Sequence, residues 1–123
     1  MVKVICFAKR KDGMSFREFD QYWGGKHAQV ATGLQRLLKY ERYVQVHAIQ
    51  TLNDLGPKFG WGAFENVFDG LAYLEYAHRQ SIDELMADPR VVEGFAKARE
   101  DELNFLDVSR SIFWVGEEKI VVG

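Results

Sequence analysis

The order of strand-like and helix-like segments is the feature that most constrains the fold of this chain. Residues 2–9 (VKVICFAK) and 40–49 (YERYVQVHAI) have the composition of strands, and the stretch between them, to about Leu38, has helical periodicity. The further elements expected are strands over 63–69 and 109–115, a short β-like end over 120–122, a helix over 70–79 with a continuation capped by Ser81, and a helix that begins at Pro89. This β-α-β-β-α-β order predicts an α+β, ferredoxin-like fold with both helices on one face of a four-stranded antiparallel sheet. A chain of 123 residues suits a single domain over 1–123.

Local signals mark where the helices begin. Ser15 followed by Glu18 fits a capping box, in which each residue satisfies a free backbone N–H of the other. Asp88 before Pro89 places a good N-cap ahead of a proline at the first helical position. Both helices therefore have defined starts in the sequence itself.

The strands are apolar on both faces, although helices cover only one face in this fold. In the first strand the two faces carry Val4, Cys6 and Ala8 on one side and Ile5 and Phe7 on the other. A sheet face that met only water would alternate apolar with polar residues. The uncovered face therefore needs a partner, and a second copy of the chain is the simplest one. We expect a homodimer joined through the sheet faces, forming a dimeric α/β barrel.

Two adjacent glycines, Gly24 and Gly25, interrupt the first helix, and each costs roughly 1 kcal/mol relative to alanine in a helix interior. On a helical wheel, His27 and Asp20 fall within the apolar stripe, and Gly24 leaves a gap between them. His27 and Asp20 are two turns apart, roughly 10.5 Å, so they meet only if the helix bends. Glycines permit such a bend, a π-bulge or the close approach of a ligand. Two readings stay open: a buried structural histidine with glycines that relieve crowding under Trp23, or a pocket that uses His27.

The second strand divides by parity into two faces. If Val44 and Val46 pack on the helices, then Tyr43, Gln45 and His47 line the uncovered face. His47 is then either a polar group of the dimer interface or a pocket residue.

Several classes of function have no support in the sequence. No histidine shares a metal-ligand spacing with another ligand, and no phosphate-binding or dinucleotide-binding glycine motif is present, so we expect no metal and no organic cofactor. The net charge of −2 does not favour nucleic acid or an anionic membrane as a partner. The single cysteine, Cys6, fits a small buried hydrophobe, and no stretch resembles a membrane helix or a signal peptide. A cytoplasmic location is expected.

Several blocks together resemble the EthD family of the dimeric α/β-barrel superfamily. The matching residues are Lys9, Arg10, Lys11, Gly13, Met14, Ser15, Phe19, Tyr22, Trp23, His27, Ala28, Arg42, Tyr43, Val44, Gln45, and near the C-terminus Asp101, Phe105 and Asp107. The chain departs from the family pattern at Gln29, where proline is usual, and at Gly24–Gly25, where larger residues are usual.

The resemblance implies a homodimer with a small-molecule cavity between sheet and helices. Related families include cofactor-free monooxygenases, polyketide cyclases and haem-handling enzymes, and fungal relatives are associated with dehydration or decarboxylation of aromatic polyketides. We therefore expect a cofactor-independent enzyme that acts on an apolar or aromatic, polyketide-like or xenobiotic molecule by cyclisation, dehydration, decarboxylation or oxygenation. The alternative is a non-catalytic binding or accessory protein that uses the same cavity. The expected catalytic residues are His27 and Asp20, and the expected substrate-binding residues are Tyr22, Trp23, Gly24, Tyr43 and His47.

Overall fold

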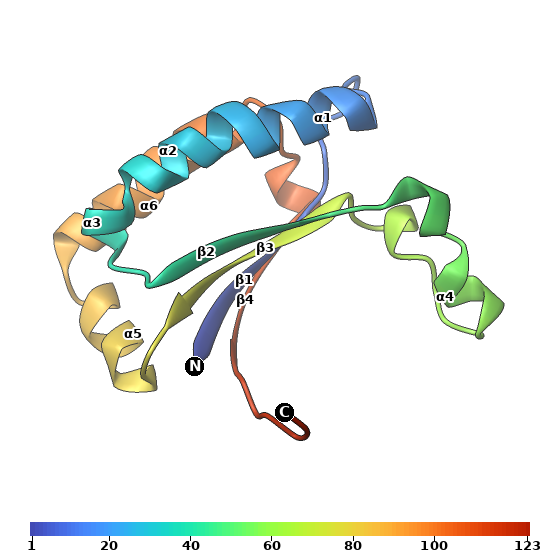
Figure 1. Ribbon diagram of the computed structural model, residues 1–123. Helices are drawn as coiled ribbons and strands as arrows, with labels where there is room; N and C mark the ends of the chain where they lie inside the picture. Colours follow the sequence, from blue (N-terminus) through green and yellow to red (C-terminus); the bar gives the residue numbers. More distant parts are fainter.

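A four-stranded antiparallel sheet carries the helices on one face (Figure 1). The structure is a computed structural model that describes residues 1–123. The strands are β1 (Val2–Ala8), β2 (Arg42–His47), β3 (Gly70–Tyr76) and β4 (Ile112–Glu117), in the order β2-β3-β1-β4. The main helices are α1 (Phe16–Tyr22), α2 (Ala28–Gly33), α3 (Gln35–Leu38), α5 (Arg79–Met86) and α6 (Pro89–Glu102). This is the expected ferredoxin-like arrangement. None of the helices is both long and apolar enough to span a lipid bilayer.

The first helical layer starts at the expected capping box and changes its winding at the two glycines. Ser15 Oγ accepts from the Glu18 N–H at 3.1 Å, and Glu18 Oε1 accepts from the Ser15 N–H at 3.2 Å. Between α1 and α2 the chain forms a π-helical segment over Trp23–His27. The layer ends at Lys39, which adopts the left-handed conformation with φ of 57°. The glycine pair thus marks a widened turn inside an otherwise continuous helical layer.

The third strand was predicted one segment too early. Residues 63–69 contain the short 3₁₀ turn Phe64–Asn66, and β3 instead occupies 70–76, where a helix had been expected. The stretch GLAYLEY is rich in leucine and alanine, which favour helices locally. In the folded chain it pairs with β1 on one side and β2 on the other, and this pairing overrides the local preference. The following helix, α5, therefore begins only at Arg79.

The remaining boundaries differ less. Residues 108–110 form a 3₁₀ turn, so β4 starts at Ile112 rather than at 109, and residues 120–122 form no strand. The segment between β2 and β3, which includes the 3₁₀ turn Gln50–Leu52 and α4 (Leu55–Lys58), projects beyond the end of the sheet (Figure 1). Its Phe59 and Trp61 side chains are largely exposed.

The sheet has an inner face under the helices and an outer face that no helix covers, although Phe64 and Phe68 pack against Phe7 at one end of it. The inner face of β1 carries Val4 and Ala8, which are buried. Residues paired directly with one another across neighbouring strands share a face, so Ile5, Phe7 and the residues in register with them form the outer face. Its apolar residues are Ile5, Phe7, Val44, Val46, Leu71, Tyr73, Ile112 and Trp114. Trp114 is 53% exposed, so this face is both apolar and open.

The assumed parity of β2 was wrong. Val44 and Val46 belong to the outer face, and Tyr43, Gln45 and His47 face the helices. Valine is not restricted to the helix side here because both faces of this sheet are apolar. Polar residues on β2 instead satisfy groups of the π-helical segment, as described below.

Candidate active site

An apolar cavity of about 560 Å³ lies between the inner face of the sheet and the helices. Of its 26 lining residues, 22 are hydrophobic, which is the composition usual for a site that takes a small organic ligand. Its polar groups are few, and four of them matter for chemistry: His27, Tyr43, Arg99 and Glu102. Cys6 also lines the wall, but burial raises the pKa of its thiol to about 12, so it remains an uncharged thiol.

His27 is held by a carboxylate on the opposite helix. Its Nδ1 lies 2.8 Å from Asp101 Oδ2, and Tyr22 Oη donates to Asp101 Oδ1 at 2.6 Å. A carboxylate accepts hydrogen bonds, so Nδ1 carries the hydrogen and Nε2 keeps its lone pair in the neutral ring. Nε2 has no hydrogen-bond partner in the chain. Every fully buried side-chain nitrogen or oxygen has such a partner, so Nε2 is not fully buried. Nε2 is therefore at least partly exposed, and His27 is a lining residue of the cavity.

Asp101 is suited to orient this ring. Burial by itself raises the pKa of the Asp101 carboxyl, but hydrogen bonds from Tyr22, His27 and Asn104 outweigh burial and lower it. Asp101 therefore stays ionised near neutral pH. An ionised carboxylate behind a histidine fixes its tautomer and stabilises the imidazolium that forms when Nε2 takes a proton.

Glu102 is a functional candidate that the sequence did not reveal. It lines the cavity next to Asp101 in the chain, and burial raises the pKa of its carboxyl although the charges of His27 and Arg99 act in the opposite sense. Arg99 Nε lies 4.0 Å from Glu102 Oε2. A carboxyl with a raised pKa is a usable proton donor. In the sequence, Glu102 looks like one more charge on the solvent face of an amphipathic helix, so no local signal identifies it.

A second histidine–carboxylate pair involves Asp20 and lies apart from the first. His47 Nδ1 is 2.6 Å from Asp20 Oδ1, and His47 Nε2 is 2.7 Å from Gln45 Oε1. Asp20 thus contacts His47 and not His27. Asp20 and His27 share the apolar stripe of the first helix, as the sequence predicted, but they do not form a pair. His47 is not among the residues that line the cavity.

The other expected binding residues occupy distinct places. Trp23 and Tyr43 line the cavity, whereas Tyr22 does not and is linked to the lining residue His27 through Asp101. The centroids of the Trp23 and His47 rings lie 4.4 Å apart, with the two rings tilted by 33°. The Trp23 ring also lies against Gly70, where a Cβ atom would come within 2.6 Å of Trp23 Cζ3. The absent side chain at Gly70 is therefore what lets the indole reach the sheet.

Gly24 and Gly25 have different surroundings. A Cβ atom at Gly24 would lie 3.1 Å from His47 Cε1, whereas one at Gly25 would meet nothing within 4 Å. The absent side chain at Gly24 therefore lets the His47 ring approach the π-helical segment. Gly25 has no comparable steric reason.

Alanine at these two positions is expected to have different effects on stability. Gly25→Ala should raise the free energy of unfolding by about 0.5–1 kcal/mol, the usual gain of alanine over glycine in a helix. Gly24→Ala should gain less or lose stability, because the His47 ring must shift away from its hydrogen bonds. Thermal or urea unfolding of both variants measures the difference, and equal gains would contradict the steric role of Gly24.

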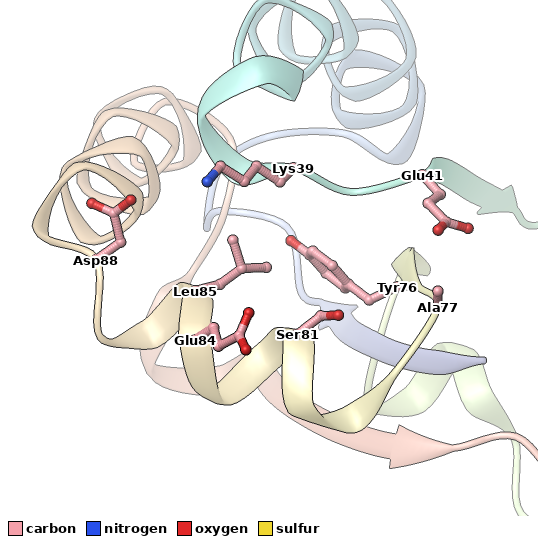
Figure 2. A pocket seen from close by; sticks show the side chains of 8 residues that line it. All are labelled: Lys39, Glu41, Tyr76, Ala77, Ser81, Glu84, Leu85 and Asp88. Carbon is pink, nitrogen blue, oxygen red and sulfur yellow. The ribbon is translucent and has the colours of Figure 1, made fainter.

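A second, smaller hollow of about 250 Å³ lies outside this site, between α5 and the turn that precedes β2. Figure 2 shows Lys39 and Asp88 at one side of it and Ser81 and Glu84 on α5 at the other. Its wall is mainly polar and open, and Tyr76 already donates its hydroxyl to the Leu38 carbonyl there. The larger apolar cavity fits an organic ligand better. The chain has no group of three or more His, Cys, Asp or Glu side chains arranged to hold a metal.

The architecture and the cavity define an α+β protein of the ferredoxin-like type with a ligand-sized space under its helices. Residues 11–109 match the EthD domain, and the chain belongs to the EthD family. No curated protein matches the chain.

Solved structures share the fold over nearly the whole chain. An ethyl tert-butyl ether d (EthD) family protein from Bacillus halodurans C-125 is 18% identical, with a TM-score of 0.62 over 97% of this chain and 99% of that one. A protein from Arabidopsis thaliana is 16% identical, with a TM-score of 0.57 over 99% of both chains. A dimeric protein of unknown function with a ferredoxin-like fold from Bacteroides fragilis NCTC 9343 is 12% identical, with a TM-score of 0.55 over 95% of both chains. At these identities the likeness concerns the fold.

Proposed function

We propose that this protein is a cofactor-independent enzyme that takes a small apolar or aromatic molecule into the cavity and uses His27 as its general base. One observation carries the proposal: His27 Nδ1 is bound to an ionised carboxylate while Nε2 is unpartnered beside an apolar cavity. A binding protein needs only the walls, whereas an oriented histidine has a use in proton transfer. Glu102, whose carboxyl pKa is raised by burial, is the proposed proton donor on the same wall.

The reaction class that these groups support is proton transfer at carbon next to a carbonyl. His27 Nε2 takes the proton, the C–H electron pair becomes a C=C bond, and the carbonyl π pair moves to oxygen. Return of a proton to carbon or loss of a hydroxyl protonated by Glu102 completes the step. Cyclisation and dehydration of aromatic ketones both use this step, and the aromatic lining of the cavity suits such planar molecules.

We also propose that the working unit is a homodimer joined through the outer sheet faces, and that it acts in the cytoplasm. The outer face of the sheet is apolar and exposed in the single chain. The Bacteroides fragilis neighbour of the same fold is dimeric. The lone cysteine makes no disulfide, which agrees with a reducing compartment.

The function is tested with 2-tetralone, a compact aromatic ketone with acidic C–H bonds next to its carbonyl. The protein is expected to bind it and to accelerate the exchange of those hydrogens for deuterium in D₂O, followed by proton NMR. A carrier would bind 2-tetralone, detected by calorimetry, and leave the exchange at the rate of buffer alone. That second result would overturn the enzymatic proposal and favour the binding protein.

A further inference from the structure

Four tyrosine hydroxyls on the inner side of the molecule differ in whether they donate a hydrogen bond within the chain. Tyr22 donates to Asp101 at 2.6 Å, Tyr40 to the Ala31 carbonyl at 2.7 Å, and Tyr76 to the Leu38 carbonyl at 2.8 Å. Tyr22 also accepts from Asn104 Nδ2 at 3.2 Å, and Tyr43 accepts from Gln45 Nε2 at 2.8 Å. Of the four hydroxyls, only that of Tyr43 has no acceptor in the chain for its own hydrogen. Because Tyr43 lines the cavity, this hydrogen is available to a bound molecule.

The direction of the Gln45 amide follows from its neighbours. Gln45 Nε2 also lies 2.8 Å from the Trp23 carbonyl oxygen, which can only accept a hydrogen bond. The amide nitrogen therefore faces Trp23 and Tyr43, and Oε1 faces His47 Nε2 at 2.7 Å. Both amide hydrogens of Gln45 are donated in this orientation, one to Trp23 O and one to Tyr43 Oη. The flipped orientation would place Oε1 against the Trp23 carbonyl oxygen, so it is disfavoured.

The same reasoning extends to His47 and Asp20. His47 Nδ1 lies 2.6 Å from the Asp20 carboxylate, and Nε2 faces the Gln45 amide oxygen, which can only accept, so Nε2 donates to Gln45. The hydrogen bonds from His47 to Gln45 and from Gln45 to Tyr43 then run in one direction. A hydroxyl that accepts a hydrogen bond becomes a better donor, and successive bonds in such a chain reinforce one another.

We propose that Tyr43 donates its hydroxyl hydrogen to a carbonyl or phenolate oxygen of the ligand, and that Gln45, His47 and Asp20 are positioning residues for this donor. The inference rests on the proposed function above and narrows the ligand class to aromatic ketones and phenols. In the enolisation step, negative charge develops on the carbonyl oxygen as His27 removes the carbon-bound proton. A fixed hydrogen-bond donor at that oxygen stabilises the charge.

The protonation state of Tyr43 agrees with this role. Burial raises the pKa of Tyr43 to about 12, although the hydrogen bond from Gln45 acts in the opposite sense. The hydroxyl therefore keeps its hydrogen at neutral pH. The π-helical segment also takes part in this network, because its Trp23 carbonyl accepts the hydrogen bond that holds Gln45 in place.

The test compares Tyr43→Phe with Tyr40→Phe as the matched control, because both rings line the cavity but only Tyr43 has a free donor. The probes are 2-tetralone and tetralin, which lacks the oxygen. Tyr43→Phe is expected to weaken 2-tetralone binding and slow its deuterium exchange about tenfold, the scale of one lost hydrogen bond, and to leave tetralin binding unchanged. Tyr40→Phe should leave the preference for 2-tetralone over tetralin as it is.

The carbonyl infrared band of bound 2-tetralone separates a donor from a merely structural residue. In the wild-type protein the band should lie at lower frequency than in hexane, and in Tyr43→Phe it should return toward the hexane value. Gln45→Leu, which leaves the hydroxyl but removes its support, should give an intermediate band and a lower maximal exchange rate with little change in the half-saturating concentration. An unshifted band in wild type, or one unchanged by Tyr43→Phe, would overturn this inference alone. Failure of both probes to bind wild type would overturn the proposed function together with it.

Discussion

Replacing His27 with asparagine is expected to slow the deuterium exchange of 2-tetralone by about 10²- to 10³-fold, the range of a lost general base. The free energy of unfolding should change by only about 1 kcal/mol, the worth of one hydrogen bond, because Asp101 keeps its bonds from Tyr22 and Asn104. The measurements are NMR exchange rates at saturating 2-tetralone and urea unfolding of both proteins.

Tyr22→Phe is the matched control for that experiment. It removes the short hydrogen bond from Tyr22 to Asp101, keeps the one from Asn104, and leaves the His27 imidazole in place. We expect exchange to fall much less than in His27→Asn, since Asp101 still orients the ring. A well-folded His27→Asn protein that exchanges 2-tetralone at the wild-type rate would remove His27 from the mechanism and leave it a structural residue.

Replacing Ile5 with glutamate is expected to convert the proposed dimer into monomers. Ile5 lies at the centre of the outer face, between Tyr73 and Trp114 on the neighbouring strands. In a two-fold interface the substitution buries two unpaired carboxylates, and the cost should raise the dimer dissociation constant on the order of 10³-fold. Sedimentation should give about twice the chain mass of 14.2 kDa for wild type at micromolar concentration and the chain mass for Ile5→Glu.

Lys97→Gln controls for the change in charge. Its side chain is 56% exposed on α6, on the other side of the sheet, and the substitution also lowers the net charge by one. It should leave the dimer intact. Wild-type protein that sediments as a monomer at micromolar concentration would contradict the proposed assembly and leave the apolar outer face without an explanation.

Both histidine–carboxylate pairs of this chain are connected to residues that line the cavity. His27 and Asp101 both belong to the helical layer, whereas the second pair joins Asp20 on α1 to His47 on the edge strand β2, next to Gln45 and Tyr43. The two pairs are separate hydrogen-bonded networks, yet His27 and Tyr43 both line the same cavity. In the proposed enolisation, His27 would supply the base from the helical layer and Tyr43 the oxygen-binding donor from β2.

The amino-acid sequence determined the features that depend on near neighbours. The Ser15–Glu18 capping box and the Asp88–Pro89 helix start were readable because a cap involves residues within one turn. Gly24 and Gly25 marked the break in the first helix for the same reason. The lack of alternation between apolar and polar residues in the strands predicted two apolar faces, and the resemblance to EthD proteins was confirmed by the family match.

Only the tertiary structure decided which distant residues meet. Helical spacing placed His27 on the buried stripe, but its partner Asp101 comes from α6, and no local pattern connects the two. Alternate residues of β2 point to opposite faces of the sheet, but both faces are apolar. The sequence therefore did not show which face Tyr43 occupies. Strand β3 was misread because its leucine and alanine content favours a helix, whereas pairing with β1 and β2 on both sides stabilises the extended chain. In each case the deciding contacts join segments far apart in sequence, and their energy exceeds the small local preferences from which a sequence is read.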